Sequence, residues 1–352
     1  MVRCGVVSFV LLGLSFPTWS SYSTSEDEYS ALAAEYHNCT DGRFDFTGDG
    51  FCDDYLNIPE CGYDGGDCCI CTCVSSACGL VDFICLDPGA AAAEFYDCKG
   101  SPPPVLPCSA ENQREWVVET TAQARTLAEA VNCSGGAFEV ERMGHVVVDK
   151  TIYVVDGTVL NVTGVGSSAG MDGNGSTRLF TVVNASLHVR GVNISYGAGV
   201  IGGGIAAAGS SMTLDRTGFI GNSADSGGGG LFVSYGSNVT CVGETFFFNN
   251  TANKSGSGAL EVSGGSSVSW SGETLFSGNT ANNSGGGALV VYGGSSVSWS
   301  GETVFSGNAA DASGALKVRD GSNVFWSGET VFSGNTADTG GALGIFFGSN
   351  VS

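Results

Sequence analysis

The sequence predicts an all-β protein: a right-handed parallel β-helix, or solenoid, preceded by a small disulfide-rich module. Three observations support this fold class. A phrase close to SGETVFSGN occurs three times, a Gly-rich segment followed by Leu recurs with it, and all 7 prolines lie at or before Pro107. Stacked coils consist of such copies, and a continuous ladder of strands needs every backbone N–H. Parallel crossovers of this kind are right-handed.

The repeat has a period of 27 to 29 residues. Its Phe column is Phe219, Phe247, Phe276, Phe305 and Phe332, and each is followed three residues on by Asn222, Asn250, Asn279, Asn308 or Asn335. Three β-prone stretches per period predict three strands and three turns per coil. Stacked coils then place Phe, Leu and Trp columns in a shared interior, although no single coil has a core.

Several columns carry specific expectations. Glycine before each Leu is expected to allow tight corners and positive φ. Each repeat Asn is expected at a left-handed turn position, with its amide bonded to the copies above and below. Cys241 falls where later coils have Trp270, so it is predicted to be a buried free thiol. A column of glutamates precedes the Phe column: Glu244, Glu273, Glu302 and Glu329. The favoured interpretation is a solvated outer row, and the alternative is a cation-binding site. Arg216, one coil earlier, is expected to neutralise Glu244 in part.

The pairing of GGAL with FSGN resembles the repeats of the polymorphic outer membrane proteins, surface adhesins with a right-handed parallel β-helix of the pectin-lyase-like fold. The resemblance covers roughly residues 200–352. It implies a surface-displayed stalk for binding or adhesion. The chain stops at GSNVS, partway through a coil that matches GSNVFWSGET, so we expect a C-terminally truncated sequence. The anchoring mode and the oligomeric state stay open.

An acidic, cysteine-rich segment at residues 38–73 contains GDGFCDDYLNIPECGYDGGDC, which resembles the Notch-type LNR repeat, a small disulfide-held calcium module. The resemblance implies disulfides between Cys39 and Cys61 and between Cys52 and Cys68. The third disulfide of the family lacks both of its cysteines here. So short a module cannot bury a core and needs disulfides or a metal. The pairing of the eight other cysteines of the secreted chain, Cys241 apart, is open.

The cofactor that this resemblance implies is Ca²⁺. Its ligands are expected to be the side chains of Asp49, Asp64 and Asp67 and the main-chain oxygen of Asp53. The family's first side-chain ligand aligns with Phe46, so Asp45 or water would have to substitute. An EF-hand loop starting at Asp45 is disfavoured because its twelfth position is Leu56, which cannot ligate calcium. A solvated acidic loop is the remaining alternative.

The chain is expected to enter the secretory pathway and to be extracellular or at the cell surface. A signal peptide, 14 cysteines and eleven N-x-S/T sequons predict a disulfide-bonded glycoprotein. A net charge of -22 disfavours nucleic acid as a partner, and no transmembrane segment is found. The expected segments are 1–20 signal peptide, 21–37 acidic segment, 38–73 LNR-like module, 74–110 Cys-rich segment and Pro-rich linker, 111–134 N-terminal capping helix, and 135–352 β-helix.

The function predicted from these observations is non-enzymatic binding or adhesion, with an extracellular glycan or a cell-surface protein as partner. One alternative is a polysaccharide-acting β-helix enzyme. Its candidate residues are Asp172, Arg178, His188 and Arg190, which could form a site, although separated single residues of this kind are more often surface charges. A second alternative is a truncated receptor ectodomain. The sequence does not identify the ligand.

Overall fold

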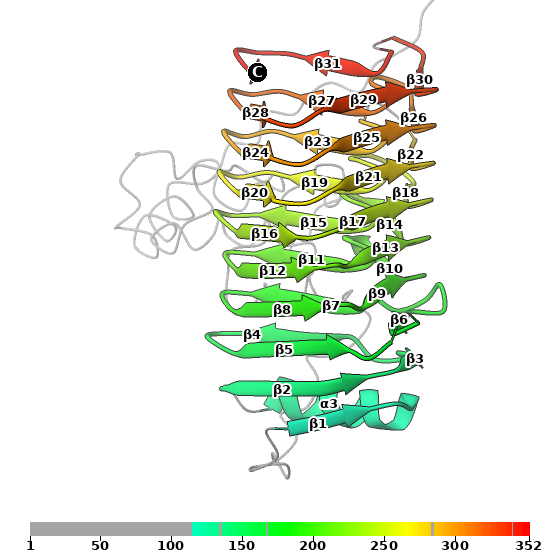
Figure 1. The fold of residues 1–352 in the computed structure, drawn as a ribbon, viewed down its shortest axis with the longest axis vertical. Coiled ribbons are helices and arrows are strands. Elements are labelled where there is room, and N and C mark those ends of the chain that lie inside the picture. The colour runs from blue at the N-terminus through cyan, green and yellow to red at the C-terminus, as the bar shows by residue number, and fades with distance from the viewer. Residues whose placement is uncertain (1–114, 134–135, 167, 283–284, 340) are drawn as a thin grey trace, which may run out of the picture. The chain divides into compact units, whose positions relative to one another are not determined.

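The computed structural model describes residues 115–133, 136–166, 168–282, 285–339 and 341–352. These residues form a parallel β-solenoid whose strands stack coil upon coil into four sheets (Figure 1). The parallel β-solenoid expected from the repeat is confirmed. Its right-handed winding stays a prediction from the rule for parallel crossovers.

The four sheets, named here A to D, run along the solenoid. Sheet A contains β1 (Glu115–Val118), β2 (Ala137–Met143), β5 (Val159–Gly164), β8 (Ser186–Arg190), β12 (Ser211–Asp215), β16 (Asn238–Val242), β20 (Ser267–Trp270), β24 (Ser296–Trp299), β28 (Asn323–Trp326) and β32 (Asn350–Val351). Sheet B contains β3 (His145–Val147), β6 (Gly170–Asp172), β9 (Asn193–Ser195), β13 (Gly218–Ile220), β17 (Thr245–Phe248), β21 (Thr274–Ser277), β25 (Thr303–Ser306) and β29 (Thr330–Ser333).

Sheet C contains β4 (Ile152–Val155), β7 (Phe180–Val183), β11 (Ile205–Ala208), β15 (Leu231–Ser234), β19 (Leu260–Val262), β23 (Leu289–Val291), β27 (Leu316–Val318) and β31 (Leu343–Ile345). Sheet D contains β10 (Ala198–Ile201), β14 (Ser223–Ser226), β18 (Thr251–Ala252), β22 (Thr280–Ala281), β26 (Ala309–Ala310) and β30 (Thr336–Ala337). The expectation of three strands per coil was therefore wrong for the regular coils. Each has a fourth strand in sheet D, which shrinks to two residues from β18 onward.

Aromatic columns fill the interior, as the period predicted. Consecutive Phe rings stack with centroids 4.7 to 4.9 Å apart from Phe219 to Phe332. Trp270 and Trp299 stack at 4.9 Å, and each indole meets the Phe ring of its own coil edge-on. Such aromatic pairs add about 0.5–1.5 kcal/mol each beyond the area they bury. Cys241 pairs in register with Trp270 and is a buried free thiol, which confirms that expectation.

The asparagines form a second buried column. Asn279 illustrates the pattern: its Oδ1 accepts hydrogen bonds from the backbone N–H and the Nδ2 of Asn250, at 2.9 and 3.0 Å. Its Nδ2 donates to the carbonyl oxygen of Phe247 at 3.0 Å. The ladder of amides is therefore confirmed, but the left-handed backbone was assigned to the wrong residue. The positive φ belongs to the residue before, as at Gly278 (φ 66) and Asn249 (φ 54).

The glycines before each Leu confirm the expectation only in part, since Gly227 (φ 73), Gly256 (φ 89) and Gly341 (φ 54) have positive φ but others have a different role. Gly229, Gly258 and Gly287 do not have positive φ. A Cβ at Gly258 would collide with the carbonyl oxygen of Gly287 in the next coil, and a Cβ at Gly287 would collide with that of Gly314. These glycines are needed because neighbouring coils approach backbone to backbone at this corner.

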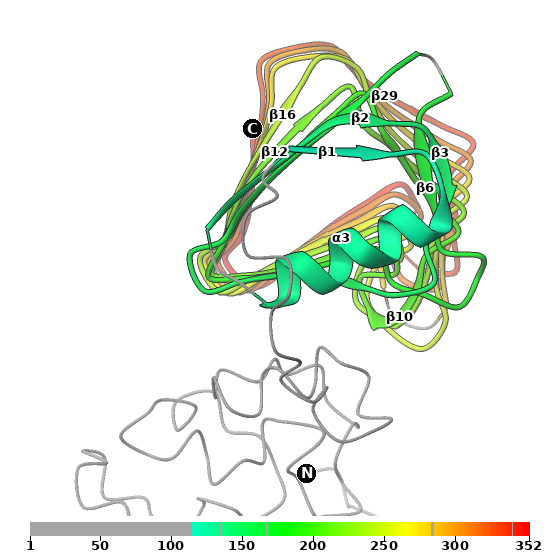
Figure 2. The same cartoon turned by 90° about the horizontal axis from the view of Figure 1, so that it is seen from below.

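One end of the solenoid carries the helix α3 (Thr121–Cys133), seen along the axis in Figure 2. Thr120 begins the helix, since its Oγ1 accepts a hydrogen bond from the N–H of Gln123 at 3.3 Å. The apolar face of α3, which includes Leu127 and Val131, is buried in the core, and the helix packs against β4. No helix among the described residues is long and apolar enough to cross a membrane.

Replacement of Gly258 by Ala is expected to lower the free energy of unfolding by more than about 2 kcal/mol, because the added Cβ meets backbone atoms that cannot move aside. Chemical denaturation of the full chain checks this. Gly144→Ala is the matched control, since its Cβ would have its nearest neighbour at 3.7 Å. Equal stability of the two variants would contradict the close-approach explanation.

Burial raises the pKa of the Cys241 thiol far above its usual range. In the unfolded chain the thiol ionises above about pH 8.5, whereas the folded chain keeps it protonated. Its contribution to stability is thus fully present below that pH and falls by about 1.4 kcal/mol per pH unit above it. Unfolding titrations of the wild type and Cys241→Val between pH 7 and 10 check this: the free energy of unfolding of the wild type, relative to that of the variant, should fall toward high pH by that slope, and a pH-independent difference would contradict it.

Candidate binding surface

The residues predicted to hold calcium and to form the module's two disulfides all lie outside the described part of the chain. This applies to Asp49, Asp53, Asp64 and Asp67 and to Cys39, Cys52, Cys61 and Cys68. Within the ranges that the structure describes, no group of three or more His, Cys, Asp or Glu side chains could hold a metal ion.

The four residues weighed for polysaccharide cleavage are not brought together. Asp172 is on β6 of sheet B, and His188 and Arg190 are on β8 of sheet A. Arg190 is exposed and pairs with Asp215 at 3.2 Å. Arg178 is buried before β7, where it donates hydrogen bonds to the carbonyl oxygen of Gly202 and to Thr181. Catalysis by paired acid and base groups requires such side chains on one face.

The residues that define the repeat face the interior. Leu260, Phe276 and Asn279 are all fully buried, as are their counterparts in neighbouring coils. They determine how the coils stack and are not available to a partner. Recognition by the solenoid must therefore use the outward positions that alternate with them.

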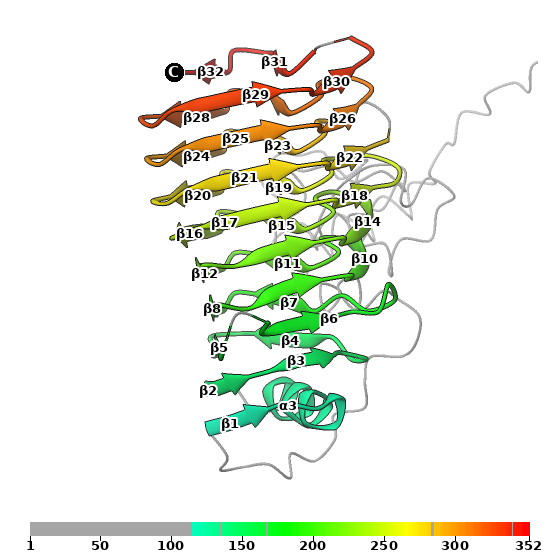
Figure 3. The same ribbon diagram turned by 45° about the vertical axis from the view of Figure 1, so that its right-hand side comes forward.

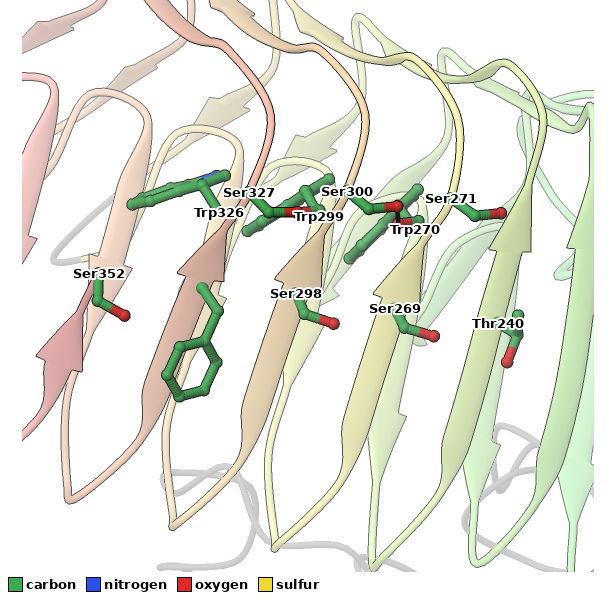
Figure 4. Close-up of a pocket in the computed structure, with 11 residues that line it drawn as sticks. Thr240, Ser269, Trp270, Ser271, Ser298, Trp299, Ser300, Trp326, Ser327 and Ser352 are labelled. Carbon is green, nitrogen blue, oxygen red and sulfur yellow. Dashed lines mark hydrogen bonds between the residues drawn. The ribbon is translucent and has the colours of Figure 1, made fainter.

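The outward positions of sheet A form a hydroxyl-lined groove of about 500 Å³. One column follows Thr240, Ser269 and Ser298 on β16, β20 and β24, which pair in register, and Phe325 continues it on β28 (Figure 4). A second column, Ser271, Ser300 and Ser327, follows directly after each Trp position. We call the surface made by these seven residues the hydroxyl groove.

The two columns differ in their hydrogen bonding. Ser300 donates to the carbonyl oxygen of Trp270 at 3.1 Å, and Ser327 donates to that of Trp299 at 3.3 Å, so their oxygens stay available as acceptors. Ser269 and Ser298 make no side-chain hydrogen bond to other described residues. Each of these hydroxyls can donate one hydrogen bond and accept two.

The groove has no ionisable side chain in its lining, and Phe325 is 44% exposed. It therefore offers neutral hydrogen-bonding groups beside the ring of Phe325, with Trp270, Trp299 and Trp326 also in its lining. The sequence predicts a surface-displayed stalk for binding or adhesion but does not identify this face or its chemistry. The signal was present in the alternation of SVSW, where the two serines face outward and Val and Trp face inward.

The column of glutamates is exposed in every coil from Glu244 to Glu329, in agreement with the reading as an outer row. Arg216, which occupies this position one coil earlier, pairs with Asp215 at 3.1 Å. The structure therefore gives its guanidinium a partner other than the expected Glu244. Cation binding by this column stays a prediction.

Comparison with known proteins supports the nature of the repeat. Residues 273–291, from the Glu before β21 to the end of β23, match the Chlamydia polymorphic membrane protein (Chlamydia_PMP) repeat. No curated protein and no solved structure matches the chain. The chain thus carries repeats similar to those of polymorphic membrane proteins in a parallel β-solenoid, which is consistent with a cell-surface or extracellular location.

Proposed function

We propose that this protein is a non-enzymatic, surface-exposed adhesin whose β-solenoid binds an extended, neutral extracellular glycan along the hydroxyl groove. The observation that carries the proposal is a pair of uncharged hydroxyl columns, one on β16, β20 and β24 and the other directly after β20, β24 and β28. Sugars present many hydroxyl groups, and serine can act as donor or acceptor to each. The dispersal of Asp172, Arg178 and His188 over different parts of the coil supports binding without cleavage.

The geometry of the groove suits a chain of sugars rather than a single one. Hydroxyls in one column repeat at the interstrand spacing of about 4.8 Å, close to the length of one sugar in an extended β-linked chain. Each contact is shallow, so affinity has to come from several coils acting together. The exposed ring of Phe325 offers a flat apolar surface against which a sugar ring can pack.

Charge next to the groove favours neutral over acidic glycans. Glu273 and Glu302 each follow the second hydroxyl column by two residues and are exposed. Their negative potential disfavours polyuronates and sulfated chains. The net charge of -22 on the whole chain likewise favours neutral over acidic glycans.

The double substitution Ser269→Glu with Ser298→Glu is expected to weaken binding to neutral β-glucans by at least about tenfold. The reason is that the bound glucan would remove water from the two new carboxylates without pairing their charge. Depletion assays with insoluble β-1,4- and β-1,3-glucan measure this, with polygalacturonate as the acidic comparison. Ser277→Glu with Ser306→Glu on sheet B is the matched control. Absence of binding to either neutral glucan, or equal loss in both variants, would overturn the proposal.

The N-terminal module is proposed to be a calcium-stabilised LNR-like unit, with Asp49, Asp64, Asp67 and the carbonyl oxygen of Asp53 as ligands and disulfides Cys39–Cys61 and Cys52–Cys68. The support is the motif GDGFCDDYLNIPECGYDGGDC, whose several carboxylates are the hard oxygen ligands that a hard cation prefers. The module would be secreted in oxidised form.

Chelation of calcium from the full chain is expected to lower the melting temperature of its least stable transition, since bound metal stabilises only the folded module. Calorimetry with and without chelator measures the shift. Asp64→Asn with Asp67→Asn should remove the response, whereas Asp54→Asn, a carboxylate outside the ligand set, should retain it. An unchanged melting profile on chelation in the wild type would contradict the calcium site.

A further inference from the structure

The outer face of sheet B carries an apolar column whose residues do not line the hydroxyl groove. Phe246, Leu275, Val304 and Val331 pair in register on β17, β21, β25 and β29, the strands that run up the middle of Figure 3. They alternate with the buried Phe column, so they point outward. Leu275 is 40% exposed and the other three are half-buried.

A column of carboxylates flanks these residues. Glu244, Glu273, Glu302 and Glu329 each precede an apolar residue of the column by two positions, and all four are exposed. Residues two apart on an extended chain project to the same side, so both columns lie on one face. We call these eight residues the sheet B stripe.

The fold does not require carboxylates at this position. Stacked coils bring them within about one interstrand spacing of each other, where like charges repel. On the neighbouring sheet A, outward positions in the same coils are neutral serines such as Ser269 and Ser298, and the coils stack equally well. Four successive glutamates beside outward-facing Leu and Val side chains therefore indicate a surface suited to a partner of opposite charge.

We propose that the sheet B stripe docks a basic amphipathic helix of a partner protein, lying parallel to the solenoid axis. An α-helix advances about 5.4 Å per turn, which nearly matches the spacing of about 4.8 Å between coils. Apolar side chains at i, i+3 or i+4, and i+7 then meet successive members of the apolar column. Lys or Arg on the adjoining flank of the helix faces the carboxylates.

Charge selects this occupant over others. A second copy of the chain would bring its own row of glutamates and a net charge of -22 to the contact. Nucleic acid and anionic lipid are repelled for the same reason. The apolar column distinguishes a protein helix from a purely polar polycation, because a polycation leaves Leu275 and Val304 uncovered.

The test uses the full chain and a fluorescent peptide of about 15 residues, with Leu at helical a and d spacing and Lys along one flank. Its comparison peptide keeps the Leu residues and replaces each Lys by Glu. Fluorescence anisotropy measures binding to the wild type, to Glu273→Lys with Glu302→Lys, and to Leu275→Ser. Asp311→Lys with Asp338→Lys is the matched control, since it makes the same change in net charge at exposed positions beside sheet D.

The wild type is expected to bind the Lys peptide and not the Glu peptide. Affinity for the Lys peptide should fall at least about tenfold in the double variant Glu273→Lys with Glu302→Lys and several-fold in Leu275→Ser. The control variant should change this affinity by less than about twofold. Binding of both peptides, or equal loss in the stripe variant and the control, would overturn the proposal. So would self-association of the wild type, measured by sedimentation, that Leu275→Ser abolishes. β-Glucan binding by Leu275→Ser should be unaffected, which separates the apolar column of this surface from the hydroxyl groove.

Discussion

In-register stacking of equal side chains between coils is the interaction on which this solenoid depends. A single coil encloses too few atoms to form a core, but the Phe rings of neighbouring coils lie 4.7 to 4.9 Å apart and continue from Phe219 to Phe332. The asparagine amides add hydrogen bonds within the same interior. Stability of this kind is a sum over neighbouring coils, so a defect in one coil weakens both of its interfaces.

The inward and outward residues of each coil have separate roles. Inward positions are nearly the same in successive regular coils because each must fit its copy above and below, as the Phe column does. Outward positions are free to differ between faces. Sheet A presents neutral hydroxyls and sheet B presents apolar side chains beside carboxylates, although both belong to the same repeat. Similarity in the repeat therefore indicates the fold, whereas the outward residues of each sheet determine which partners can bind.

The sequence predicts what repeats at the coil period and misses what depends on local geometry. The Phe and Trp columns and the burial of Cys241 follow from spacing alone. Sheet D was missed because two-residue strands such as β22 have no alternation to detect. The position of the left-handed residue was off by one because Asn279 and Gly278 are both common in that conformation, and only the hydrogen bonds of the buried amide separate them. The hydroxyl groove could not be predicted from the sequence without the register of β20 on β24, because that register brings separate serines together into a continuous surface.

The direction of the asparagine ladder also bears on how such a rod can vary in length. Each amide accepts from the coil before it and donates toward the coil after it, as Asn250, Asn279 and Asn308 do in turn. Every coil therefore presents an amide acceptor at one boundary and an amide donor at the other, as its neighbours do. Removal or duplication of one whole coil joins a matching pair of boundaries and leaves no amide unsatisfied, so the gene can lengthen or shorten the rod in whole-coil steps while each remaining layer keeps its bonding.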